Sequence, residues 1–560
     1  MCDDSMNNKS RRNFLTGAFT LGAGTFILDP IRALSEGITD HFISQAMAET
    51  TGTVASRNYV NVQMGGAPIR YQFDQWLRTS VSDVALANVA ATGALNPMIC
   101  NSFNIDSAGK VTMAMRTTTY RNMIVPIIFS QSVYNSKGQK RALTDLLNNM
   151  LVVRGYGSGL DGHQFNIIAQ QAPIGGVPTL TAIAAESSPT TFDSIQWPDR
   201  GGNGTFISNA GKAQNKIPGT TPLTTLMEGF GTPANKAAYN LKNTYASSME
   251  LAQARLKSYA RSNNAGSKIV SQNLTNATDM MKKGVSNLAS YWSEAVPRYQ
   301  AAIYTSMRES NLPGISDKPL ISDETAPWAV GTGDILKVSK NMDARDMIKA
   351  VTISNFAQSM ALTEYILKEG LAASLDVRAD GLAGLAIRGV NDTAAISRNL
   401  GLDIHATGAP MVVLLMTAYF RAIAAGILEL SDQLGPQLWS NTVVQLQGDF
   451  GRTARSNGTG SDHGYNQMVT SAFSGAFNNG PIVVGNIKQA GSSANYDGTQ
   501  GLAAAISGYN QSGAPNPAMA ASTVTALLGV SHNPFANTAS PLVSLTNGTL
   551  KTAATAKIVT

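Results

Sequence analysis

A glycine-rich segment at residues 448–464 brings acidic, basic and imidazole side chains close together in the sequence. Asp449 stands near its start, Arg452 follows three positions later, and the adjacent pair Asp462 and His463 stands near its end. Carboxylate and imidazole groups are ordinary ligands of zinc and other divalent metals, and glycines let the backbone fold back so that both ends can meet. The Arg452 guanidinium is suited to binding an anionic substrate through two hydrogen bonds. The alternative is a surface loop that carries a hydrogen-bonded histidine.

Two further histidines lie beside an acidic residue or in a glycine-rich run. Asp403 and His405 are separated by one residue, so an extended backbone places both side chains on one face, where they can bind the same metal ion. A buried or helix-capping pair is the other interpretation of these two residues. His163 ends the glycine-rich run 157–163 and is a candidate catalytic residue, although a lone histidine in such a loop is more often structural.

The composition excludes several other kinds of site. Cys2 and Cys100 are the only cysteines, too few for a thiolate zinc site or a disulfide scaffold. The sequence contains neither a Walker-type phosphate loop nor a Gly-x-Ser-x-Gly elbow. The net charge of +6 is spread over 560 residues without a basic run, so we expect no nucleic-acid partner.

The segments that must position these side chains alternate between strand and helix patterns. Short β-type runs occur at Tyr59–Met64, Met150–Val153, Leu371–Val377, Asn441–Gln447 and Pro481–Val484. Helical patterns occur at Met347–Lys368 and Met411–Leu434. This alternation predicts an α/β fold with a mainly parallel sheet covered by helices on both faces.

Residues that follow parallel strands meet at one edge of such a sheet, which is where α/β proteins form their sites. We therefore expect Asp403, His405 and His463 to converge, although 58 positions separate the two histidines. Around one zinc ion, the two imidazoles would approach within roughly 4 Å of each other.

A helical subdomain is predicted at residues 234–310, packed beside the sheet within a single domain at residues 49–560. One apolar helical face repeats every three or four residues from Met281 to Met307, and Pro297 is expected to kink it. The apolar stretch Met411–Phe420 ends at Arg421 after ten residues, so we interpret it as a buried helix rather than a membrane span.

The first 48 residues have the pattern of a twin-arginine export signal. Arg11 and Arg12 precede Phe14 and an uncharged, glycine-containing apolar run that continues to Leu28, and residues 46–48 provide a small-x-small cleavage site. The alternative is a basic N-terminus that leads into a core helix. The export interpretation predicts the twin-arginine machinery as a partner and a periplasmic or extracellular location.

The chain resembles the twin-arginine-exported domain-of-unknown-function family fifteen-hundred-and-one, a branch of the alkaline phosphatase-like superfamily. The resemblance covers, with gaps, about residues 59–545. The family's Gly-Glu-Phe-Gly-Arg-Thr-Pro, a following Asn and Asp-His-Trp are similar to residues 448–454, Asn457 and residues 462–464 here. Its Asp-Thr-His is similar to residues 403–405, and its strand, Arg and downstream His are similar to residues 151–154 and His163.

This resemblance implies an alkaline phosphatase-like fold and two divalent metals, zinc above all. It also shows one departure. Where the family has His-x-Asp-Thr-Phe-Asp, this chain has Ile69 and Tyr71 in place of the His and the first Asp, so one metal is short of a ligand unless Asp74 replaces it.

Two functions therefore remain open from the sequence. The first is a metal-dependent hydrolase of phosphate or sulfate esters. In that function His163 is catalytic and Arg452 binds the substrate anion. The candidate ligands are Asp403, His405 and His463 around one metal, with Asp449 and Asp74 around the other, and Asp462 is a further candidate ligand. The second is a degenerate relative that keeps the fold and serves as a non-catalytic exported binding or assembly protein, with another exported protein as its partner.

Overall fold

The architecture was obtained from a computed structural model of the 560-residue chain. The structure describes residues 56–79, 96–108, 111–188, 190, 192–199, 206–218, 290–309, 315, 344–387, 396–455, 458–485, 487, 515–553 and 558–559. The leader at residues 1–48 lies outside the described residues, as does most of the predicted helical subdomain.

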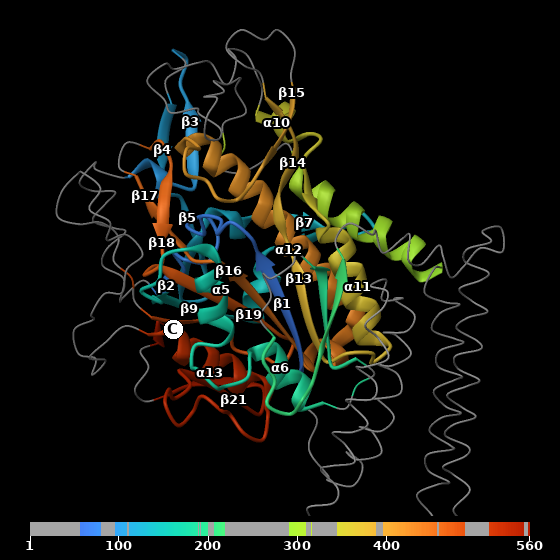
Figure 1. The fold of residues 1–560 in the computed structure, drawn as a ribbon. Helices are drawn as coiled ribbons and strands as arrows, with labels where there is room; N and C mark the ends of the chain where they lie inside the picture. The colour runs from blue at the N-terminus through green and yellow to red at the C-terminus, as the bar shows by residue number, and fades with distance from the viewer. Residues whose placement is uncertain are drawn as a thin grey trace, which may run out of the picture.

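A nine-stranded sheet forms the centre of the molecule (Figure 1). Its strands, in spatial order, are β11 (Gln214–Pro218), β10 (Ser194–Asp199), β13 (Ser374–Arg378), β1 (Asn58–Met64), β16 (Thr442–Gly448), β19 (Met468–Phe473), β9 (Met150–Tyr156), β20 (Ile482–Val484) and β23 (Ile558–Val559). All strands except β19 and β23 run in the same direction. The predicted mainly parallel α/β sheet is therefore confirmed.

Helices cover both faces of this sheet because successive strand residues point to opposite sides. In β1, Val60, Val62 and Met64 belong to the apolar cluster that includes α11 (Phe356–Lys368) and α12 (Ala409–Ser440). The opposite face packs against α6 (Leu180–Glu186) and α13 (Pro517–Leu528), and α5 (His163–Gln171) contacts β16 through hydrogen bonds from Gln170 and Gln171. Figure 1 shows α5, α6 and α13 on one side of the strands and α11 and α12 beyond them.

Smaller elements surround the sheet. The described short helices are η1 (Pro97–Ile99), η2 (Ile127–Ser130), α4 (Thr144–Asn148) and α10 (Ala344–Ile348). The three-stranded sheets are β12 (Thr352–Ser354), β14 (Asp380–Ile387) and β15 (Ile396–Leu400), and β2 (Arg78–Thr79), β6 (Met123–Pro126) and β5 (Thr117–Tyr120). The two-stranded pairs are β3 (Ser102–Ile105) with β4 (Val111–Ala114), β7 (Ser132–Tyr134) with β8 (Lys140–Ala142), β17 (Gly451–Ala454) with β18 (Ser461–Gly464), and β21 (Val543–Thr546) with β22 (Thr549–Thr552).

The helix predicted at Met347–Lys368 is wrong in its first half. The chain forms α10, then β12, and only then α11. Thr352 and Ile353 are β-branched residues that favour an extended backbone, and β12 pairs with β14. The second half is correct, and Gly370 follows the helix with a φ of +61°, as expected for a glycine at a helix C-terminus.

The apolar helix predicted at Met411–Leu434 is longer in the structure. Gly435 adopts a non-helical backbone, and helical structure then resumes from Pro436 to Ser440. Arg421 does not end the buried stretch, because its Nε donates to the carbonyl of Ser306 at 2.9 Å within the core. Among the described residues, α12 is the one helix long and apolar enough to cross a membrane, and its apolar window is entirely buried within the protein.

Residues 290–307, which fall within the predicted 234–310 subdomain, are helical. Trp292, Tyr299 and Met307 on its apolar face are buried against the main core, and the helix is assigned without interruption at Pro297. Arg298 forms an ion pair with the buried Glu364 of α11 at 2.6 Å. The residues before 290 lie outside the described residues.

Candidate metal centre

The site lies at the edge of the sheet where the parallel strands end. Asp449 follows β16, and His163 opens α5 after the loop that leaves β9. Asp403 and His405 lie in the segment between β15 and α12. The segment expected to be a glycine-rich loop forms the β17–β18 hairpin instead, and that hairpin carries His463. Residues from four parts of the chain therefore meet at one edge, as expected for an α/β site.

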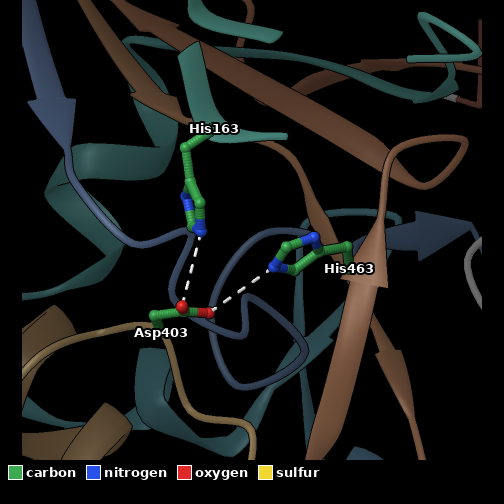
Figure 2. A group of neighbouring side chains, drawn as sticks. All are labelled: His163, Asp403 and His463. Carbon is green, nitrogen blue, oxygen red and sulfur yellow. Dashed lines mark ion pairs between the residues drawn. The ribbon is translucent and has the colours of Figure 1, made fainter. Parts of the chain in front are cut away.

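Three histidine side chains point one ring nitrogen at the Asp403 carboxylate. His163 Nε2 lies 3.4 Å from Asp403 Oδ2, while His405 Nε2 and His463 Nε2 lie 3.1 and 4.0 Å from Oδ1. His163 and His463 approach this carboxylate from different directions (Figure 2). Ligand atoms of His163, Asp403 and His463 all lie within 4.8 Å of one another, so this group can hold a metal ion.

The two histidines separated by 58 positions are in direct contact. His405 Nε2 lies 3.1 Å from His463 Nε2, which is within the distance expected from the sequence. Segment 403–405 reaches His463 because its backbone packs against the hairpin. The Ser461 amide donates to the carbonyl of Ile404 at 3.3 Å, and a Cβ at Gly460 would lie 2.0 Å from the His405 carbonyl oxygen.

Each histidine has a carboxylate beside its other ring nitrogen. His163 Nδ1 lies 2.8 Å from Asp449 Oδ2, and His463 Nδ1 lies 2.7 Å from Asp161 Oδ1. His405 Nδ1 is 3.6 Å from Asp462 Oδ1, a longer separation. Carboxylates in this position fix the ring orientation of a metal-binding histidine and keep its proton on the nitrogen that faces away from the metal.

Asp449 lies behind His163 rather than in the centre of the cluster. Its carboxylate is buried, with Oδ1 accepting from Gln63 Nε2 at 2.7 Å and Oδ2 accepting from the Gly66 amide at 2.8 Å as well as facing His163. These contacts occupy the oxygens that a metal would need. The structure therefore corrects the expectation that Asp449 binds a metal directly and makes it a support for His163.

Asp462 also lies at the outer side of the cluster. Its exposed carboxylate accepts from Arg455 Nη2 at 2.6 Å. This ion pair lowers the pKa of Asp462, mainly through the hydrogen bond from Arg455. The structure thus places Asp462 behind His405, in the same relation as Asp449 to His163, and not among the converging ligand atoms.

Arg452 is buried, in contrast to its expected role as the substrate-binding arginine, and its Nη1 has no hydrogen-bond partner among the described residues. Its guanidinium is fully buried, donates through Nε to the carbonyl of Ala67 at 2.8 Å, and donates through Nη2 to Gly66 and Asp403. Arg452 therefore holds Asp403 in place, and its role in binding substrate is corrected.

Asp74 is not brought to the cluster either. Its buried carboxylate forms an ion pair with Arg70 and accepts from the Ser471 hydroxyl at 2.5 Å. Arg70 in turn donates to the carbonyls of Leu446 and Val469, both at 3.1 Å. Asp74 is thus the partner of a structural arginine, which corrects the expectation that it replaces a lost metal ligand.

Tyr71 contacts the backbone of the β17–β18 hairpin, which carries His463. Its hydroxyl donates to the Arg452 carbonyl at 2.7 Å, and its side chain is fully buried. A phenol in this role supports the strand that carries Arg452. At the position where the resemblance implies an aspartate, this chain therefore has a tyrosine whose hydroxyl hydrogen-bonds to the protein backbone.

The charges of the cluster shift the protonation of its members in opposite directions. Hydrogen bonds to Asp403 and Asp449 raise the pKa of His163 to about 9. Burial opposes ionisation of Asp403, but hydrogen bonds and charges from His163 and Arg452 outweigh it and hold its pKa well below its usual range. Without a metal the centre is therefore an ion-pair network around an ionised Asp403.

Two hydroxyl groups of the hairpin, those of Thr453 and Ser461, have hydrogen-bond partners away from Asp403. Thr453 Oγ1 donates to Gln467 Oε1 at 2.7 Å, and Ser461 Oγ donates to the carbonyl of Ile404 at 3.1 Å. Neither is directed at Asp403. A side-chain hydroxyl nucleophile is therefore not identified among these residues.

Sequence reasoning missed Asp161 and Gln63. Asp161 stands two positions before His163, so its proximity to a candidate histidine was a usable signal, but its partner is His463, 302 positions away. Gln63 is the last residue but one of the buried strand β1, and an amide there carries no sequence signal of its own.

Searches against protein-family models, curated proteins and solved structures found no match to this chain.

Proposed function

We propose that this protein is an exported, divalent-metal-dependent hydrolase of phosphate or sulfate esters, with an alkaline phosphatase-like arrangement of its sheet and site. The mainly parallel sheet, with ligands at the ends of its strands, supports the proposal. So does the match between the three histidine positions and the family pattern, because the sequence segments around His163, His405 and His463 meet at one place.

The contact between His405 and His463 is the observation that carries the metal proposal. Asp161 beside His463 Nδ1 favours a proton there and leaves His463 Nε2 as an acceptor, whereas His405 Nε2 lies 3.1 Å from the ionised Asp403 carboxylate. His405 Nε2, His463 Nε2 and the Asp403 carboxylate therefore converge as three atoms that can each donate an electron pair to a cation. A cation bound between them would replace the contacts that these groups make with one another.

The spacing of the donor atoms fits one zinc ion. Ligands bound tetrahedrally at about 2.0–2.2 Å lie roughly 3.3–3.6 Å from each other. The separations in the structure are 3.1 Å between His405 and His463, 3.1 Å from His405 to Asp403, 3.4 Å from His163 to Asp403 and 4.0 Å from His463 to Asp403, so His463 would move slightly inward on binding. We therefore propose His163, Asp403, His405 and His463 as the ligands of a single metal.

A bound divalent ion supplies a Lewis acid that polarises an ester oxygen and lowers the pKa of water. The chain orients the site around it. Arg452 fixes Asp403, while Asp449, Asp462 and Asp161 orient the three histidines. Asp74 and Asp449 are both committed to other partners, so we propose one metal rather than two.

The alternative is an exported metal-binding protein without catalytic activity. It is favoured by the inward orientation of Arg452 and by the engagement of the nearby hydroxyl groups. It shares the metal centre with the hydrolase, so metal content alone does not separate the two functions.

Metal analysis combined with an ester assay tests the proposal. The purified wild-type protein should contain about one equivalent of zinc or another divalent ion, and His463→Ala should lose it. His532→Ala is the matched control because His532 is an exposed histidine beyond α13. Metal-dependent hydrolysis of an aryl phosphate or aryl sulfate, lost in His463→Ala, supports the hydrolase. Bound metal without hydrolysis supports the alternative, and wild-type protein that binds no metal contradicts both.

A further inference from the structure

An exposed apolar surface lies on the segment that carries His163. Four large apolar side chains are exposed among the described residues, and three of them, Leu160, Phe165 and Ile168, belong to this one segment. Phe165 is the most exposed, at 63%, and Ile168 follows it by three positions on the same face of α5. A single exposed apolar residue needs no explanation, but a cluster of them often marks a binding surface. We call these three residues the apolar rim.

The apolar rim adjoins the metal centre on both sides of His163. Leu160 directly precedes Asp161, whose carboxylate lies 2.7 Å from the Nδ1 atom of another histidine of the centre. Phe165 follows His163 by two positions, and a Cβ at Gly162 would lie 3.3 Å from Phe165 Cδ2. The Phe165 ring therefore folds back against the backbone that joins the two site residues. These contacts place the apolar rim beside the candidate ligands.

Hydrogen bonds fix the backbone that displays the apolar rim. The buried Asn166 donates through Nδ2 to the carbonyls of Leu160 and Gly162, at 2.7 and 2.8 Å. Ser158 Oγ accepts from the Leu160 amide at 3.1 Å, and the Ser158 amide donates to the carbonyl of Tyr465 at 3.0 Å. A binding surface that is already ordered loses little conformational freedom when a ligand binds.

The charges around the apolar rim do not suit a further anionic group. Residues 155–172 contain no Lys or Arg. The Asp161 carboxylate within this segment is 71% exposed. On the hairpin, Arg455 is paired with Asp462, and Arg452 is buried. The surface beside the metal centre therefore favours an uncharged, apolar group over one that carries additional phosphates.

We propose that the apolar rim binds the organic group of the substrate, which is an ester of phosphate or sulfate with an apolar alkyl or aryl alcohol. This inference rests on the proposed function and names its substrate class. Phe165 is the main specificity-determining residue, because its ring is the most exposed and lies against Gly162. Leu160 and Ile168 extend the apolar contact along the surface.

Alkyl ligands that cannot be hydrolysed test the inference without requiring catalysis. Methylphosphonate and hexylphosphonate form one pair, and methanesulfonate and hexanesulfonate form the other. Each is titrated by calorimetry into the full-length protein in the presence of zinc. Within a pair the charged group is constant, and each buried methylene group should tighten binding about fourfold. The hexyl ligand of at least one pair should therefore bind at least tenfold more tightly than its methyl counterpart. Equal affinities within both pairs, or no binding of either pair, would overturn the proposal.

Variants then assign the preference to Phe165. Phe165→Ser should fold because the side chain is largely exposed, and it should reduce the preference for the hexyl ligand to less than threefold. Phe165→Leu should keep part of the preference because it remains apolar. Ile207→Ser is the matched control, since Ile207 is the fourth exposed apolar side chain and its carbonyl accepts from Thr179, before α6. A preference that Phe165→Ser leaves unchanged contradicts the assignment.

The two proposals fail in different ways. A preference for hexyl ligands that depends on Phe165, without hydrolysis of hexyl phosphate or hexyl sulfate, contradicts the proposed hydrolase and leaves the binding role of the apolar rim standing. Hydrolysis of methyl and hexyl esters with equal kcat/KM contradicts the apolar rim and leaves the hydrolase standing. If Phe165→Ser instead abolishes self-association and leaves the ligand preference unchanged, the apolar rim binds a second copy of the chain and the inference is overturned.

Discussion

The three histidines of the centre are each oriented by a carboxylate, and Asp449 is the best enclosed of these carboxylates. It is 3% exposed and accepts from Gln63, the Gly66 amide and the His163 ring. An asparagine of the same shape would place an NH2 group where one of these donors now points. The charge that holds the His163 ring would also be lost.

Asp449→Asn is therefore expected to weaken metal binding by about 10–100-fold, the usual effect of losing such a support. Competition with a zinc-chelating dye measures the affinity. Asp432→Asn is the matched control, because Asp432 is an exposed partner of Arg141 away from the centre. An affinity equal to that of the control would show that Asp449 does not act through His163.

At this scale the sequence predicts which residues meet better than it predicts what each one does. His405 and His463 could be selected because histidine is scarce in this chain and each of the two has an acidic residue within two positions, which also selected Asp403. The direction of a side chain is set by packing that the sequence does not display. Arg452 in a glycine-rich segment therefore suggested an exposed anion-binding group, whereas it is buried against Ala67 and Asp403.

Among the elements, the turn after β1 determines how closely the backbone of residues 402–403 can approach Gly66. Gly66 has a φ of +90°, and a Cβ there would lie 2.7 Å from the Asp403 amide nitrogen. Its own amide also binds Asp449, and its carbonyl accepts from Arg452. One backbone position thus joins β1, the Asp403 segment and the hairpin.

Gly66→Ala should both destabilise the fold and lower metal affinity, because the added methyl group displaces Asp403. Gly138→Ala is the matched control. The φ of Gly138 is +75°, but nothing lies within 4 Å of the added Cβ. Gly138→Ala should therefore lower the free energy of unfolding only by the backbone strain of about 1–2 kcal/mol. Urea unfolding and zinc titration measure both effects. If the two variants lose equal stability and Gly66→Ala keeps full metal affinity, the close approach has no role in the site.

Some strands and helices with an apolar pattern were predicted, because burial on both faces leaves a signal in the sequence, but the buried strand β19 and the apolar helix α13 were not. The five predicted strand regions all contain a strand of the main sheet. The weaker elements were missed. β12 is only three residues long, and β17 and β18 were hidden by the glycines that allow the hairpin to pack closely.

For the whole molecule, the metal centre exists only after the chain has folded. Asp161 and His463 are in contact although 302 positions separate them, and Asp403 reaches both His163 and His463. An unfolded chain would offer these ligands separately, so metal binding as proposed would be coupled to folding. The predicted twin-arginine route exports folded proteins and would therefore allow the metal to be inserted in the cytoplasm.

The paired arginines of the leader give the last prediction. Replacing Arg11 and Arg12 together by lysine preserves the charge and removes the guanidinium pair that defines the signal. We expect the protein with this double substitution to remain in the cytoplasm, folded and with its metal bound, whereas Arg32→Lys should be exported like the wild type. Cell fractionation with metal analysis of each fraction provides the measurement. Full export of the double variant would exclude the twin-arginine route, and a cytoplasmic form without metal would show that the ion is acquired only after export.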